Sequence, residues 1–255
     1  MSINKKQNKS RLLKALAFLL LIIIVGLIFY TGKEVADDYI EYKEVEDTQE
    51  EIIEQVVDTS SETENEFSVN WDELKSINSD VIAWVRIPNT NISYPVVNSS
   101  KYLRKNIYGR YSKGGTPFVD DNIAKPFDCV NTIIYGHNLQ NGTVFADLKK
   151  YSNQEYANAH SIVYIYLPDN TVRKYTIVSF HIVKATDTGI YNPFVEDVME
   201  YKDVMLSNNV LKNVDIDTND KIITLSTCTN KGDNRYVLHC KWQDDNIMKG
   251  AKDYE

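Results

Sequence analysis

Hydrophobic and polar residues follow three different patterns along this chain of 255 residues. Residues 15–30 form an unbroken apolar run, ALAFLLLIIIVGLIFY. Residues 33–66 are rich in acids, and apolar residues recur among them at loosely helical spacing. From residue 67 onward, short runs of alternating apolar and polar residues are separated by turn residues, a pattern typical of β-structure. The chain is therefore expected to hold an apolar segment, a spacer and one mainly β domain.

The apolar run is long enough to cross a membrane, since a spanning helix needs about 20 residues. We predict a transmembrane anchor at 15–32. The segment 1–14 should be cytoplasmic, because basic residues precede the run and acids follow it. A cleaved signal peptide is the alternative, but its apolar region runs about 7–15 residues and ends in a small-x-small site. The end of this run, Ile-Phe-Tyr-Thr-Gly, is a poor site of that kind.

Charge divides the chain at the same places. Residues 34–66 carry fourteen acids against one lysine, a net charge of −13, whereas residues 67–255 sum to about −1. We interpret 33–69 as an acidic extracellular linker, part of it helical, and 70–255 as the main domain. A domain so close to neutral argues against nucleic acid as the partner, because phosphate binding requires a basic surface.

Eight apolar or alternating runs within the main domain predict strands, and their number and turn-rich spacing favour a closed antiparallel β-barrel. A short helix over 70–78 is predicted to precede them, with Asn70 as its N-cap and Glu73 three residues later. Helical inserts are expected at 143–159 and 193–208. The predicted strands are 81–87, 92–97, 116–119, 130–135, 161–167, 171–184, 221–227 and 235–242.

Three residues at strand ends form a candidate catalytic group. Cys228 closes the run KIITLST and opens into a loop, where a thiol can meet substrate. His137 follows another strand end directly after Gly136, where it can act as a proton shuttle. Arg235 begins the next strand seven residues after the cysteine, so a hairpin would return its guanidinium near the thiol to hold an oxyanion. Each residue alone also fits a structural role; the combination is the signal.

These residues resemble those of the sortase family. The resemblance rests on Thr-Leu-Ser-Thr-Cys at 224–228 with Arg235 seven positions on, and on Tyr-Gly-His at 135–137. It extends over roughly residues 70–242. The serine of the cysteine motif, the N-terminal helix and the helical insert before the cysteine strand look like class B. The resemblance implies an eight-stranded barrel with a Cys-His-Arg site, and 70–255 as the catalytic domain.

The resemblance also implies a reaction and its partners. The thiolate would cleave a C-terminal sorting signal of a secreted protein, of the Asn/Ser-Pro-x-Thr-Asn/Gly type, through a thioacyl intermediate. A peptidoglycan amine would then resolve that intermediate and attach the protein to the cell wall. Neither a cofactor nor a metal is implied. The residues expected to line the sorting-signal groove are Tyr135, Ser226, Leu103 and Tyr191.

Several other features are open or point elsewhere. Cys129 and Cys240 could form a disulfide or remain buried thiols, and the remaining histidines fit structural roles better than a zinc site. One rival interpretation is a cell-wall L,D-transpeptidase or cysteine peptidase, although the former typically has its histidine beside the cysteine. Another is a non-catalytic surface binding module in which Cys228 is a core residue.

Overall fold

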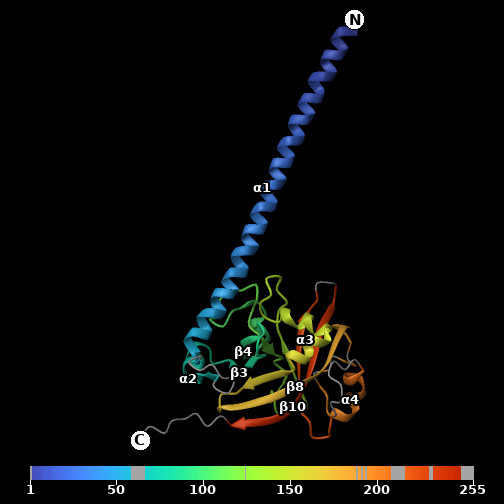
Figure 1. Cartoon of the computed structure of the whole chain (residues 1–255). Coiled ribbons are helices and arrows are strands. Elements are labelled where there is room, and N and C mark those ends of the chain that lie inside the picture. Colours follow the sequence, from blue (N-terminus) through green and yellow to red (C-terminus); the bar gives the residue numbers. More distant parts are fainter. Residues whose placement is uncertain are drawn as a thin grey trace. The chain divides into compact units, whose positions relative to one another are not determined.

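A computed structural model of the whole chain provides the fold (Figure 1). It divides into two units, Met1–Lys43 and Glu44–Glu255, and the helix α1 (Ser2–Val56) runs through both. Within the first unit, the apolar side chains around residues 13–30 are exposed. The part Leu13–Val56 of α1 is a candidate membrane span, with a mean hydropathy of 2.7 over an 18-residue window. The residues that the structure describes are 2–58, 67–123, 125–187, 189–190, 192, 194–207, 216–229 and 232–247.

The second unit is built around a closed barrel of eight strands, as the sequence predicted. Their order around the barrel is β10-β8-β7-β3-β4-β5-β6-β9. The strands are β3 (Val81–Arg86), β4 (Ser93–Val97), β5 (Phe118–Val119), β6 (Asn131–Tyr135), β7 (Ile162–Tyr166), β8 (Thr171–Lys184), β9 (Ile222–Cys228) and β10 (Asn234–Ile247). A separate two-stranded sheet joins β1 (Val57–Asp58) to β2 (Ser68–Val69).

The expectation that all strands pair antiparallel was wrong. β4 pairs with β5 in parallel, and β6 pairs with β9 in parallel. Alternation of apolar and polar residues reports that a segment is a strand, but it carries no information about which strand lies beside it. The β6–β9 pair matters most for function, because parallel neighbours end at the same rim of a barrel.

The helices lie close to where the sequence predicted them. In α2 (Trp71–Ile77), the Asn70 side chain accepts a hydrogen bond from the Glu73 amide at 3.1 Å, which confirms the N-cap. The first predicted insert is a 3-10 helix followed by a short α-helix, and the second holds α4. These elements are η3 (Ala146–Ser152), α3 (Gln154–Ala159) and α4 (Val198–Leu206); a further 3-10 helix is η2 (Ser100–Arg104).

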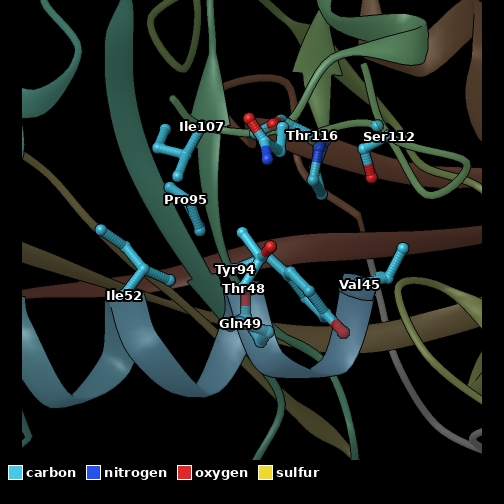
Figure 2. Close-up of a pocket in the computed structure, with 12 residues that line it drawn as sticks. Val45, Thr48, Gln49, Ile52, Tyr94, Pro95, Ile107, Ser112 and Thr116 are labelled. Carbon is cyan, nitrogen blue, oxygen red and sulfur yellow. The ribbon is translucent and has the colours of Figure 1, made fainter. Parts of the chain in front are cut away.

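The second half of α1 belongs to the compact unit, although the sequence placed it in a solvated linker. Val45, Ile52 and Val56 are buried, and Ile52 and Val56 join the hydrophobic cluster around Trp84 and Leu74. Acids on the other faces of the helix explain why composition alone suggested a spacer. Figure 2 shows Val45 and Ile52 on the helix facing the barrel across a small pocket of about 20 Å³. No predicted site residue lines that pocket, which we interpret as a packing seam.

We predict that Ile52→Ala lowers the free energy of unfolding by about 2–5 kcal/mol, because the truncated side chain leaves a cavity between α1 and the barrel. Urea unfolding of the full-length chain in detergent measures this change. Glu50→Ala, at an exposed position two residues away, is the matched control and should change stability little. Equal effects from the two substitutions would show that this part of the helix is a linker after all.

Candidate active site

Cys228 lies at the rim of the barrel. The six residues of β9 that precede it are buried, whereas Cys228 itself is exposed. The strand pairs along its length with β10 on one side and β6 on the other. The thiol is therefore held by a rigid, doubly paired strand and opens to solvent where that strand ends.

Arg235 lies directly across from this thiol. In the antiparallel ladder of β9 and β10, Arg235 and Cys228 are Cα partners, so their side chains leave the same face of the sheet. The next pair along is closed by a hydrogen bond of 2.9 Å from the Thr229 amide to the Asn234 carbonyl. The guanidinium is half-buried and donates from Nη1 to that same carbonyl at 3.1 Å.

The loop that carries His137 reaches the same rim from the other side of β9. Tyr135, the last residue of β6, is the Cα partner of Ser226 in the parallel β6–β9 ladder, so β6 ends at the same rim, two residues before Cys228. The Gly136 amide donates to the Ser226 carbonyl at 3.0 Å. The Asn138 side-chain amide donates to the Cys228 carbonyl, also at 3.0 Å. The residues on both sides of His137 are thus bonded to the strand that ends in the thiol.

The imidazole of His137 is held by the 3-10 helix η2. Its Nε2 lies 2.8 Å from the carbonyl oxygen of Leu103. Because a carbonyl can only accept, Nε2 carries the proton in the neutral ring and Nδ1 keeps its lone pair. Burial is the largest influence on this ring and lowers the pKa of His137; the Leu103 carbonyl opposes that effect and the charge of Arg104 adds to it. Neutral imidazole therefore predominates at neutral pH.

Close packing fixes the backbone around the imidazole. A Cβ atom on Gly136 would lie 2.6 Å from the ring of Phe145, so only glycine fits there. A Cβ on Gly115 would lie 2.5 Å from the Leu103 carbonyl oxygen, and this glycine has a φ of 59°. Val144, at the far end of the loop, has a φ of 58°, a strained value for a β-branched residue. Such strain persists only where the surroundings hold the backbone firmly.

Three of the four predicted groove residues lie around this rim. Tyr135 stacks on Phe118, with ring centroids 5.2 Å apart, and Leu103 exposes 48% of its surface. Ser226 leaves the sheet on the same face as Cys228 but is buried beneath it. Tyr191 lies outside the described residues. Asn138 has no signal in the sequence other than its position beside His137.

The other cysteines and histidines take no part in this arrangement. Cys129 and Cys240 are both free thiols, which resolves the alternative left open by the sequence. Cys240 is fully buried, and burial raises the pKa of its thiol. His181 and His239 are buried in the barrel wall, and His160 stacks on Tyr156.

A family model described as the sortase domain matches residues 85–243. The chain belongs to the sortase family. It is 31% identical to sortase B of Listeria monocytogenes over 63% of this chain and 68% of that protein. Its identity to sortase B of Staphylococcus aureus is 28%, over 81% of this chain and 87% of that protein. The solved structure of Clostridium perfringens sortase B superposes with a TM-score of 0.61 at 29% identity, covering 68% of this chain and 99% of that one.

These findings confirm the class B assignment and the eight-stranded sortase barrel. The protein is a cysteine transpeptidase that acts on sorting signals, so the rival interpretations as an L,D-transpeptidase or a non-catalytic binding module lose their support. As in the family generally, its partners are substrate proteins that carry a sorting signal and an amine of the cell wall. The apolar N-terminal helix is consistent with an anchored enzyme.

Proposed function

We propose that Cys228 is the nucleophile of this transpeptidase, His137 its proton carrier and Arg235 its oxyanion-binding residue. The observation that carries the proposal is the pairing of Cys228 with Arg235 across the β9–β10 ladder. The hydrogen bonds from the His137 loop to Ser226 and Cys228 support the third member.

The first half of the reaction is acylation. The sulfur attacks the threonine carbonyl carbon of the sorting signal, and the guanidinium of Arg235 stabilises the negative charge on the carbonyl oxygen. The carbon–nitrogen bond then breaks, and His137 delivers to the leaving amine the proton taken from the thiol. The product is a thioester on Cys228 and a free C-terminal tail.

The second half repeats these roles in reverse. The incoming amine loses a proton to His137 and attacks the thioester carbonyl. The carbon–sulfur bond then breaks, and His137 returns the proton to the departing thiolate. A new amide then joins the protein to the amine. We assign the amine to a peptidoglycan precursor or cross-bridge, and the signal to the Asn/Ser-Pro-x-Thr-Asn/Gly type. Tyr135, Ser226, Leu103 and Tyr191 would line the groove that holds it.

The anchor provides the location for this chemistry. We assign residues 15–32 to the membrane span, 1–14 to the cytoplasm and 70–255 to the catalytic domain outside the cell. Within the predicted extracellular linker, 33–69, the second half of α1 packs against that domain. Support comes from the basic residues before the span and the acids after it. Tethering at the outer face raises the effective concentration of membrane-bound substrates.

Substitution of the three residues tests the proposal. In full-length enzyme with a synthetic sorting-signal peptide, Cys228→Ala and His137→Ala should abolish cleavage, and Arg235→Ala should lower kcat about 10²- to 10³-fold. Mass spectrometry should find a peptide thioester on Cys228 in the wild type. Cys129→Ser, at a half-buried thiol remote from the motif, is the matched control and should stay active. A thioester elsewhere, or cleavage by Cys228→Ala, contradicts the assignment.

The pKa of His137 predicts a pH dependence. Because burial lowers that pKa, the imidazole stays neutral to a pH below its usual value of about 6.5, and activity falls only when it takes up a proton. We expect the acid limb of kcat/KM to have an apparent pKa below 6.5. Arg104→Ala should raise the apparent pKa of this limb, because the positive charge of Arg104 opposes protonation of the imidazole. Arg104→Lys keeps that charge and should leave the apparent pKa unchanged. A limb at or above 6.5, unchanged in Arg104→Ala, would be inconsistent with His137 as the titrating group.

A further inference from the structure

Two buried histidines lie on the face of the barrel that bears Cys228. The register places His181 in the same cross-strand row as Val237 and Ser226. This row lies two residues along the strands from the row of Cys228 and Arg235, on the same face. Two residues further along, the next row on the same face holds Ser179, His239 and Thr224. Partner residues in a ladder share a face, so both imidazoles leave the sheet on the side of the thiol.

These imidazoles bond to the insert between β8 and β9. His181 donates from Nε2 to the carbonyl of Met205, near the C-terminal end of α4, at 2.8 Å. His239 lies 2.7 Å from the hydroxyl of Tyr201 and 3.1 Å from the carbonyl of Ile190, in both cases through Nε2. The Tyr201 hydroxyl in turn donates to the Ile190 carbonyl.

Both ring nitrogens of His239 have hydrogen-bond partners. Because the Ile190 carbonyl only accepts, Nε2 carries the proton and Nδ1 accepts from the Ser179 hydroxyl at 2.9 Å. Burial is the main reason that the pKa of His239 falls to about 3, with His181 contributing, so the ring is neutral. A buried polar group that loses its hydrogen-bond partner costs free energy. The folded state therefore favours the one arrangement in which all of these groups are bonded.

The insert begins beside the active site. Its first residue, Ala185, donates from its amide to the Asp233 carbonyl at 2.9 Å, in the hairpin that carries Arg235. Ile190, to which both His239 and Tyr201 bond, directly precedes in sequence Tyr191, which the proposed function assigns to the groove. Tyr201 also lines a hollow of about 400 Å³ in the insert, together with Phe194.

We propose that His239 and His181 are positioning residues that fix the insert at Ile190, Tyr201 and Met205, and so set the affinity for the sorting-signal peptide. This inference rests on the proposed function, because it takes the insert as one wall of the peptide groove. The two histidines act through the insert and do not touch the reacting atoms.

Tyr201→Phe tests this inference with the smallest change, since it removes one hydroxyl from the arrangement. In full-length enzyme we expect the KM for the sorting-signal peptide to rise about three- to tenfold. We expect kcat to change less than about twofold, because the lost interaction stabilises the bound substrate and the transition state equally. The rate at which iodoacetamide alkylates Cys228 should stay unchanged. Tyr156→Phe is the matched control, because no described residue bonds its buried hydroxyl; its KM should equal that of the wild type.

A pair of substitutions at His239 distinguishes positioning from bulk packing. His239→Gln keeps a donor near the place of Nε2 and should retain more peptide affinity than His239→Leu, which has none. An unchanged KM in Tyr201→Phe overturns the inference, even if His239→Leu fails to fold. A lower kcat together with slower alkylation also overturns it, because the residues would then act on the thiol. Wild-type enzyme that neither cleaves the peptide nor forms the thioester would instead refute the proposed function, before any of these variants is compared.

Discussion

The register of β9 between its two neighbours is the constraint on which the site depends. The parallel β6–β9 ladder brings the ends of both strands to one rim, and the β9–β10 hairpin places Arg235 opposite Cys228, the last residue of β9. Side chains alternate along a strand with a period of two, so a slip of one residue would turn the thiol to the other face. Backbone hydrogen bonds hold Cys228, Arg235 and the start of the His137 loop at one rim of the barrel.

The elements outside the barrel hold the parts of the site that strands alone cannot fix. The 3-10 helix η2 supplies the Leu103 carbonyl that sets the tautomer of His137. The second half of α1 packs close to the same region, since a Cβ on Gly114 would lie 2.8 Å from Val45. Asn141, in the loop after His137, donates to the Glu46 carboxylate of that helix at 2.9 Å. The second half of α1 thus supports the loop that carries His137.

Much of the fold was readable from the sequence, because alternation and turn residues are local signals. All eight predicted strands exist, and the N-cap Asn70 was correctly placed. The parallel β6–β9 pairing was not readable, since it joins segments more than 85 residues apart that share no local pattern. Part of the acidic segment was correctly expected to be helical, but the packing of the second half of α1 on the barrel was not predicted, because its acids outweighed a narrow apolar stripe. His239 fits an ordinary structural role in the sequence, and only the fold brings it to Tyr201.

The Arg235→Cys variant tests the central register most directly. Residues 229 and 234 form a hydrogen-bonded pair of the ladder. The adjacent pair, 228 and 235, is therefore a non-hydrogen-bonded one, with Cα atoms about 4.5 Å apart. That separation lies within the range that a disulfide accepts. Oxidation followed by peptide mapping should find Cys228 joined to the introduced cysteine, and Tyr236→Cys, on the opposite face, should give no such bond. A disulfide in Tyr236→Cys and none in Arg235→Cys would contradict the account.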